Sequence, residues 1–105
     1  MGKSQRDKGS RVERELVNRL KDSGVTAQRV PLSGMCAGYK GDIELQVGGE
    51  PWVAEVKSRA QASGWRMVKV WLGENDLLFL REDGVKDPLV VMNWNRFMDL
   101  MGVNY

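Results

Sequence analysis

The stretch GDIELQVGGEPWVAEVKS, residues 41–58, decides the fold of this chain. Apolar and polar residues alternate over residues 42–47, which is the period of a strand with one buried face. Gly48 and Gly49 make a tight turn, and residues 51–58 form the next strand. The stretch therefore predicts a β-hairpin, and its second strand is of the kind that is covered on both faces.

Three charged residues of this hairpin are hard to explain as solvated surface. Glu55 and Lys57 lie two residues apart, so they share one face of the second strand, and Asp42 opens the first strand. One interpretation is a buried Glu–Lys ion pair with a structural role only, although desolvation offsets most of the attraction in such a pair. The other is a site for chemistry, in which the lysine stabilises charge that develops beside the carboxylates.

A third carboxylate belongs to a helix predicted from Ser10 to about residue 23, with Gly24 as its stop signal. On a helical wheel Glu13 falls at about 100°, inside an apolar arc that includes Val12 and Leu16. A carboxylate that faces the core is costly unless it is paired or binds a metal ion. The alternative is a capping box, in which Glu13 reaches back to the amide of Ser10.

The remaining elements complete an order α-β-β-β-α-β-β-α, which predicts an α/β fold with a mixed β-sheet flanked by helices. Residues 1–8 are interpreted as a flexible basic arm and residues 9–105 as a single domain. The other predicted elements are strands at 25–30, 77–80 and 89–92, helices at 65–72 and 94–101, and a glycine-rich loop at 33–41. Aromatic residues and methionines at helical spacing in the last helix indicate either core packing or a dimer surface.

Composition removes several classes of chemistry. The chain has 105 residues, no histidine and one cysteine, which excludes Ser-His-Asp catalysis, histidine-based zinc sites and an internal disulfide. Any metal ion held here is expected to be a hard, oxygen-binding one such as Mg²⁺. No apolar run is long enough for a membrane span, and residues 1–9 lack the apolar region of a signal peptide, so we expect a cytoplasmic protein.

Charge is distributed unevenly along the chain, although the net charge is only +2. Residues 1–69 hold 13 Lys and Arg against 8 Asp and Glu, whereas residues 70–105 hold 3 against 6. Such asymmetry is typical of a small protein with a nucleic-acid-binding face, and a solvated surface is the alternative.

The ordered set of Glu13, Asp42 and Glu55-Val56-Lys57 resembles the PD-(D/E)XK nuclease superfamily. The sequence GSRVEREL at residues 9–16 narrows the resemblance to the archaeal-type Holliday junction resolvases, and the likeness covers residues 9–58. The resemblance implies a restriction-endonuclease-like αβββαβ core. After Lys57 the chain departs from the resolvase pattern and looks like a compact phage-type member.

The resemblance also implies roles for individual residues. Asp42 and Glu55 would bind Mg²⁺ directly, with Mn²⁺ able to substitute, and the backbone carbonyl of Val56 would complete the ligand set. Glu13 would be a further ligand, directly or through water, and Lys57 would orient the nucleophile. The expected DNA-contacting residues are Arg11, Arg14, Arg29, Ser33, Lys40 and Arg59.

These observations predict a Mg²⁺-dependent, structure-selective DNA endonuclease. The favoured interpretation is a homodimeric Holliday junction resolvase that acts on branched DNA in recombination, repair or replication, in a prokaryotic or phage-infected cell. One alternative is a less selective endonuclease or nickase of the same superfamily, similar to the virus-type replication-repair nucleases. Another is a DNA-binding module without catalytic activity.

Overall fold

The computed structural model describes residues 3–30, 41–60 and 64–102, and for residues 3–7 it describes the backbone alone. The helices and strands follow the predicted order, and their ends agree with the predicted ends to within two residues, except at the start of α1. The elements are α1 (Lys3–Asp22), β1 (Ala27–Arg29), β2 (Ile43–Val47), β3 (Glu50–Arg59), α2 (Trp65–Leu72), β4 (Leu77–Glu82), β5 (Leu89–Val91) and α3 (Trp94–Met101).

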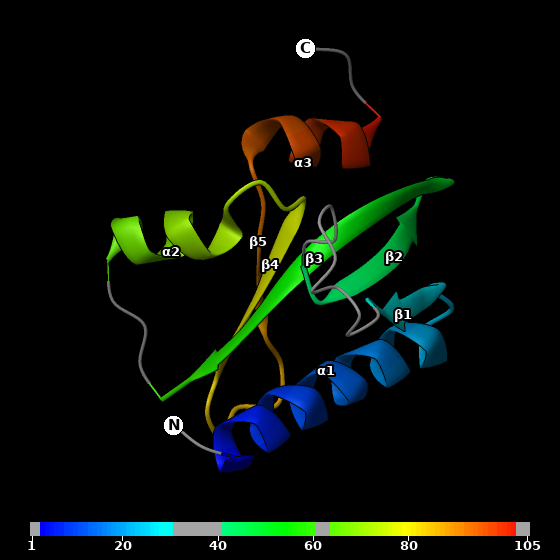
Figure 1. Cartoon of the computed structure of the whole chain (residues 1–105). Helices are drawn as coiled ribbons and strands as arrows, with labels where there is room; N and C mark the ends of the chain where they lie inside the picture. The colour runs from blue at the N-terminus through cyan, green and yellow to red at the C-terminus, as the bar shows by residue number, and fades with distance from the viewer. Residues whose placement is uncertain (1–2, 31–40, 61–63, 103–105) are drawn as a thin grey trace.

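The five strands form one mixed sheet in the order β1-β2-β3-β4-β5 (Figure 1). Neighbouring strands are antiparallel except β3 and β4, which are parallel and are joined through α2. A parallel pair needs such a crossover, because the chain must return to the starting edge before the second strand begins. The mixed sheet with flanking helices confirms the predicted α/β fold class.

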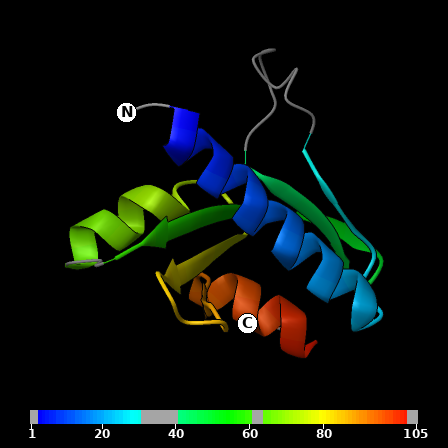
Figure 2. The ribbon, with the colours of Figure 1, turned by 90° about the horizontal axis from the view of Figure 1, so that it is seen from below.

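The core lies between α1 and one face of the sheet. Ile43 pairs with Ala54 and Leu45 with Trp52, so the alternation predicted for the hairpin puts all four on this face. Helix α1 runs diagonally across the strands and buries its apolar side against them (Figure 2). The buried members of this core are Val12, Leu16, Val17, Ala27, Ile43, Leu45, Trp52, Ala54, Leu77 and Phe79.

Helix α1 begins earlier than predicted. Residues 3–8, predicted as a flexible arm, form its first two turns, so the predicted start at Ser10 is wrong. Gly9 does not prevent this extension: a glycine inside a helix costs about 1 kcal/mol, and the flanking residues and the packed face outweigh that cost. Because Ser10 lies inside the helix, its amide is no longer a free end, and the capping-box interpretation of Glu13 is also wrong.

Helix α3 packs differently from the prediction of a core helix. None of its residues is buried, and Trp94, Phe97, Leu100 and Met101 are exposed. Its main link to the sheet is Arg96, which lies over the ring of Trp52 and forms an ion pair of 2.8 Å with Asp76. The core interpretation of this stripe is therefore wrong, and the dimer-surface alternative stays open.

Among the described helices, none combines the length and the apolarity that crossing a bilayer requires.

Gly41 lets the backbone pass close to the side chains of Val53 and Asn75, just before β2. Its φ of +81° lies in the left-handed region that glycine adopts freely. A Cβ atom at this position would clash with Cγ1 of Val53 and lie 2.8 Å from Oδ1 of Asn75. Proline, with φ near −65°, cannot adopt this conformation, so the structure explains why this chain has Gly-Asp where the nuclease motif has Pro-Asp.

We expect Gly41→Ala to lower the free energy of unfolding by about 2–4 kcal/mol, because the added methyl group must both displace Val53 and keep a positive φ. Urea unfolding followed by circular dichroism measures this loss. The matched control is Gly24→Ala, which has a φ of +92° with no atom within 4 Å of the new Cβ and should cost about 1 kcal/mol. Equal losses in the two variants would contradict the steric argument.

Candidate active site

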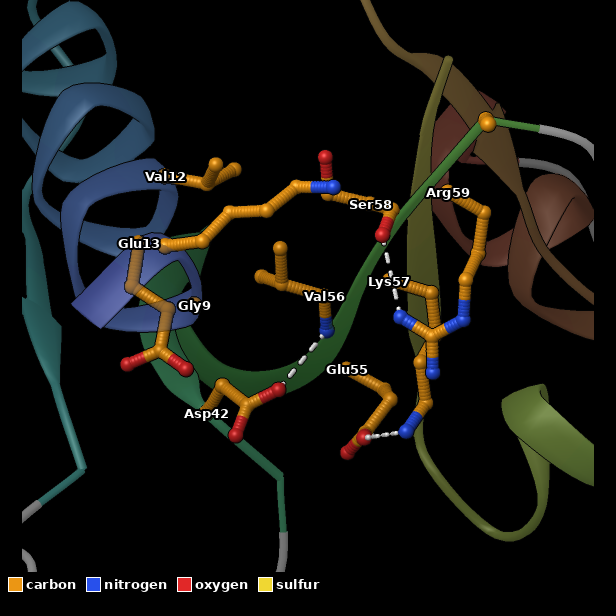
Figure 3. Close-up of a pocket in the computed structure, with 11 residues that line it drawn as sticks. Gly9, Val12, Glu13, Asp42, Glu55, Val56, Lys57, Ser58 and Arg59 are labelled. Atoms are coloured by element: carbon orange, nitrogen blue, oxygen red, sulfur yellow. Dashed lines mark hydrogen bonds and ion pairs between the residues drawn. The ribbon is translucent and has the colours of Figure 1, made fainter. Parts of the chain in front are cut away.

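A cavity of about 580 Å³ opens beside the C-terminal half of β3 and the N-terminal half of α1 (Figure 3). It brings together all four predicted catalytic residues, which come from α1, from the residue before β2, and from β3. The residues that line it are Lys8, Gly9, Val12, Glu13, Asp42, Glu55, Val56, Lys57, Ser58, Arg59 and Ala60.

The cavity forms where β3 extends beyond its neighbour β2. The ladder between them starts at the pair Ile43 and Ala54, so Val56 lies past the start of β2. There the amide of Val56 donates a hydrogen bond of 2.9 Å to Oδ2 of Asp42. The backbone of Asp42 is itself held on both sides, since its N–H donates to Ala54 and its carbonyl accepts from Val30.

This arrangement also orients the backbone carbonyl of Val56. The N–H and C=O groups of one strand residue point to the same neighbouring strand. Because the N–H of Val56 points to Asp42, its carbonyl faces the same open edge of β3. Asp42 and the Val56 carbonyl thus share that edge with the cavity.

Glu55 and Lys57 reach the cavity from the opposite face of the sheet to Val56, as their spacing predicts. Nζ of Lys57 lies 3.5 Å from Oε2 of Glu55, and the two side chains are 27% and 21% exposed. The pair therefore lines an open cavity, where a fully buried structural pair would have no access to solvent. Figure 3 shows the Lys57 amine beside Glu55, with the carboxylates of Glu13, Asp42 and Glu55 on the same side of the end of β3.

The carboxylates repel one another in this partly buried setting. Burial raises the pKa of the Glu13 carboxyl, the charge of Asp42 raises it further, and Arg29 opposes the shift. Burial also raises the pKa of Glu55, again with a contribution from Asp42, while Lys57 opposes it. A cluster of carboxylates whose charges cost free energy is a common property of catalytic and ion-binding sites.

The sequence model of the archaeal Holliday junction resolvase (Hjc) family matches residues 4–83. The chain belongs to this family. The match covers α1 to β4 with the whole cavity, and it ends before β5 and α3. Neither the curated proteins nor the solved structures gave a match. Members of the Hjc family are nucleases, which supports nuclease activity in general for this chain.

The cavity of this Hjc member offers only a few oxygen donors to a metal ion, and such a set suits a hard cation. Within the described residues, no three Asp, Glu, Cys or His side chains are arranged as a metal-binding group. Glu13 is held by Arg29, and Glu55 lies against Lys57. Because the contact of Glu55 with Lys57 is the longer one at 3.5 Å, Glu55 can join Asp42 and the Val56 carbonyl as donors, a set that fits Mg²⁺ because this ion uses one or two carboxylates and keeps several waters.

Arg29, predicted to touch DNA phosphates, instead contacts two residues of α1. Its Nε donates to Oε1 of Glu13 at 3.1 Å, and its Nη2 donates to Oγ of Ser10 at 3.4 Å. The side chain is 27% exposed. A phosphate contact by Arg29 stays a prediction, whereas its contact with Glu13 orients that carboxylate toward the cavity.

Among the other predicted DNA contacts, three are exposed and two lie outside the described residues. Arg11 and Arg14 are exposed on α1 and make no ion pair with any side chain that the structure describes. Arg59 lines the cavity itself. Ser33 and Lys40 belong to the segment that the structure does not describe.

Lys8 and Ser58 also line the cavity, and neither is among the site residues predicted from the sequence. Both contact Asp83 in the β4–β5 connection: Nζ of Lys8 lies 2.7 Å from its Oδ1, and Oγ of Ser58 donates to it at 3.2 Å. A helix predicted from residue 3 would have placed Lys8 near the site, because Lys8 and Val12 are four residues apart and share one face of a helix.

The raised pKa of Glu55 predicts that its charge destabilises the fold. Because the folded-state pKa lies above the ordinary 4.5, the charge of Glu55 does not lower the free energy of unfolding below pH 4.5. Its full destabilising effect is present above the folded-state pKa. We therefore expect Glu55→Gln to raise the melting temperature by a few degrees, ~2–5 °C, at pH 7 in EDTA. The difference from the unaltered protein should vanish on acidification to below pH 4.5.

Differential scanning fluorimetry across this pH range measures the effect. The control is Glu50→Gln, which removes the same charge from an exposed position at the start of the same strand. A lower melting temperature for Glu55→Gln at pH 7 would mean that the ion pair with Lys57 outweighs burial, contrary to the argument.

Proposed function

We propose that this Hjc-family chain is a Mg²⁺-dependent endonuclease that hydrolyses phosphodiester bonds in branched DNA, as a Holliday junction resolvase. The observation that carries the proposal is the convergence of Glu13, Asp42, Glu55 and Lys57 on one cavity at the open edge of β3. The family match over residues 4–83 supports the same class of activity. The metal dependence and the branched substrate are the parts that require experiment.

In this mechanism Asp42, Glu55 and the Val56 carbonyl would hold the ion, with Glu13 as a further ligand, directly or through water, while it remains bound to Arg29. When bound, Mg²⁺ would supply a water of lowered pKa and positive charge for the scissile phosphate. Lys57 lines the cavity beside Glu55, where its ammonium group would orient the attacking water and stabilise negative charge developing on the phosphate.

Exposed basic residues of α1 and β3 would hold the DNA backbone. Arg11, Arg14 and Arg59 are exposed, and each phosphate contact releases counterions, which makes binding depend on salt. Ser33 and Lys40 are proposed as further contacts from the segment between β1 and β2. Acidic residues outnumber basic ones after residue 69, which favours the first two-thirds of the chain as the DNA side.

A second copy of this chain is the partner we propose for α3. Its exposed apolar residues are unusual for a monomer surface, and its charged residues Arg96 and Asp99 pair with each other at 2.9 Å, so the helix offers no net charge to a polyanion. The preceding strand β5 is an edge of the sheet, with Leu89 and Val90 exposed. Self-association covers such an edge, and it supplies the two active sites that symmetric cutting of a junction needs.

The catalytic assignment predicts that Asp42→Asn and Lys57→Ala each lower the rate of junction cleavage by about 100-fold or more, since each removes a group that acts on the reacting phosphate. The assay compares a synthetic four-way junction with linear duplex, single strand and a flap, in Mg²⁺ and in Mn²⁺. Glu44→Gln is the control, because Glu44 pairs with Gln28 at 3.0 Å and does not line the cavity.

Paired symmetric nicks in the junction alone would support a resolvase. Cleavage of every substrate would favour a less selective endonuclease or nickase of the superfamily. Tight binding with no cleavage in either ion would favour a DNA-binding module. Strong residual cleavage by Asp42→Asn or Lys57→Ala would contradict the assignment of the catalytic residues.

The dimer proposal predicts that Leu100→Glu, at a 49% exposed position of α3, shifts the protein from dimer to monomer. A charge placed in an apolar interface loses its hydration without gaining a partner. Light scattering after size-exclusion chromatography gives the mass. Val70→Glu, at a 65% exposed position of α2, should leave the dimer intact. A monomeric unaltered protein at micromolar concentration would refute the proposal.

A further inference from the structure

Helix α2 presents an exposed face that combines an indole with basic side chains. Counted at 100° per residue from Trp65, Lys69, Arg66 and Val70 fall at about 40°, 100° and 140°. Trp65 is 86% exposed, which is unusual for an indole, and Val70 is 65% exposed. The less exposed residues Val68, Trp71 and Leu72 fall at about 300°, 240° and 340°, beyond the Trp65 side of this face. We name the outward set Trp65, Arg66, Lys69 and Val70 the α2 face.

Helix α2 is tied to the catalytic cavity through Arg59, which contacts its residue Trp71. Arg59 lines that cavity, and its guanidinium group lies 5.5 Å from the ring centre of Trp71 in α2. Arg59 shares its face of β3 with Glu55 and Lys57, because the three are two residues apart. Helix α2 therefore covers the sheet face that carries the catalytic pair.

The arrangement of the elements agrees with this link. Figures 1 and 2 show the start of α1, the end of β3 and the start of α2 on the same side of the molecule. Trp65 is the first residue of α2, whereas Trp71, which meets the cavity-lining Arg59, lies one residue before the end of the helix. A DNA strand bound in the cavity would reach Trp65 by running along α2.

The charges of the α2 face indicate what binds it. Arg66 and Lys69 are exposed and make no ion pair with a side chain in the described parts of the chain, and α2 contains no acidic residue. The exposed apolar helix α3 differs, since its Arg96 is paired with Asp99 and with Asp76. An apolar surface set among unpaired positive charges is complementary to a polyanion with stacking groups, which describes DNA with unstacked bases.

We infer that α2 is the element that recognises the branch point, with Trp65 stacked on a base that the branch leaves unstacked and with Arg66 and Lys69 bound to the flanking phosphates. The inference rests on the proposed function, because it deepens the choice of branched DNA as substrate. In a continuous duplex the bases are covered by their neighbours, so Trp65 has no base face to contact there. The indole then adds affinity for a branch and none for plain duplex.

The experiment measures binding and needs no cleavage. Fluorescence anisotropy in EDTA gives the affinity of each variant for a four-way junction and for a linear duplex with the same arm sequence. Trp65→Ala is expected to weaken junction binding by about tenfold and to leave duplex binding unchanged, since stacking on an aromatic side chain is lost at one base. Trp65→Phe should retain part of the preference, because it keeps an aromatic ring.

Two further variants separate stacking from charge. Met67→Ala removes exposed apolar surface from the same helix at a position outside the α2 face, and it should change neither affinity. The double variant Arg66→Ala with Lys69→Ala should weaken junction and duplex binding alike. It should also reduce the slope of log affinity against log salt by about 2, as expected for two lost phosphate contacts.

A junction that carries 2-aminopurine at the branch provides an independent readout. Binding of the unaltered protein should quench its fluorescence by stacking, and binding of Trp65→Ala should not. Because Trp65 is almost fully exposed, the variant is expected to keep its melting temperature, which excludes misfolding as the cause of a loss.

The outcomes distinguish this inference from the proposed function. If the unaltered protein binds junction and duplex equally, the proposed branched substrate is refuted, and the inference with it. If the unaltered protein prefers the junction and Trp65→Ala keeps the full preference, the inference alone is refuted. If Trp65→Ala changes the mass of the protein in solution and not its DNA preference, the α2 face is a protein contact and the inference is overturned.

Discussion

The hydrogen bond from the Val56 amide to the Asp42 carboxylate is the interaction on which the candidate site depends. It bridges β2 and β3 at the point where their backbone ladder has ended, and it satisfies a donor whose loss would cost about 1–3 kcal/mol if buried and unpaired. A side chain thus replaces the neighbouring strand, so the edge of β3 beyond Ala54 stays open. Gly41 makes this possible, because the backbone turns there against Val53 with no room for a Cβ atom.

The electrostatics of the cavity favour function over stability. Burial raises the pKa of Glu13 and of Glu55, and Asp42 adds to both shifts, so the folded chain holds negative charges that it would be more stable without. Arg29 and Lys57 reduce that cost without removing it. A structural ion pair would be expected to lower the pKa of its carboxylate. The direction found here is the reverse, because burial outweighs the attraction of Lys57, and this favours a role in the site over a role in stability for the pair of Glu55 and Lys57.

The hairpin and the site were predictable because both are local. Alternation fixed the inward face of residues 42–47, and a Glu-x-Lys on an otherwise apolar strand identified the face that carries chemistry. Contacts between distant segments were not predictable: Lys8 meets Asp83 across 75 residues, and nothing in either segment indicates the other. The prediction that the apolar stripe of α3 belongs to the core was wrong for a related reason. Periodicity identifies an apolar face, but whether the same chain covers that face depends on the tertiary fold.

The two helices with exposed apolar residues, α2 and α3, differ in charge, and this difference matches the distribution of charge along the sequence. The family match and the excess of basic residues both cover α1 to α2, whereas β5 and α3 follow residue 83, in a segment where acidic and basic residues are equal in number. An apolar surface without excess positive charge gives a polyanion little attraction, but it suits a partner whose own charges are paired. Under the two proposals, DNA would therefore be drawn to the basic side with the cavity more than to α3. The chain would then offer one apolar helix to nucleic acid and the other to protein without the two surfaces competing.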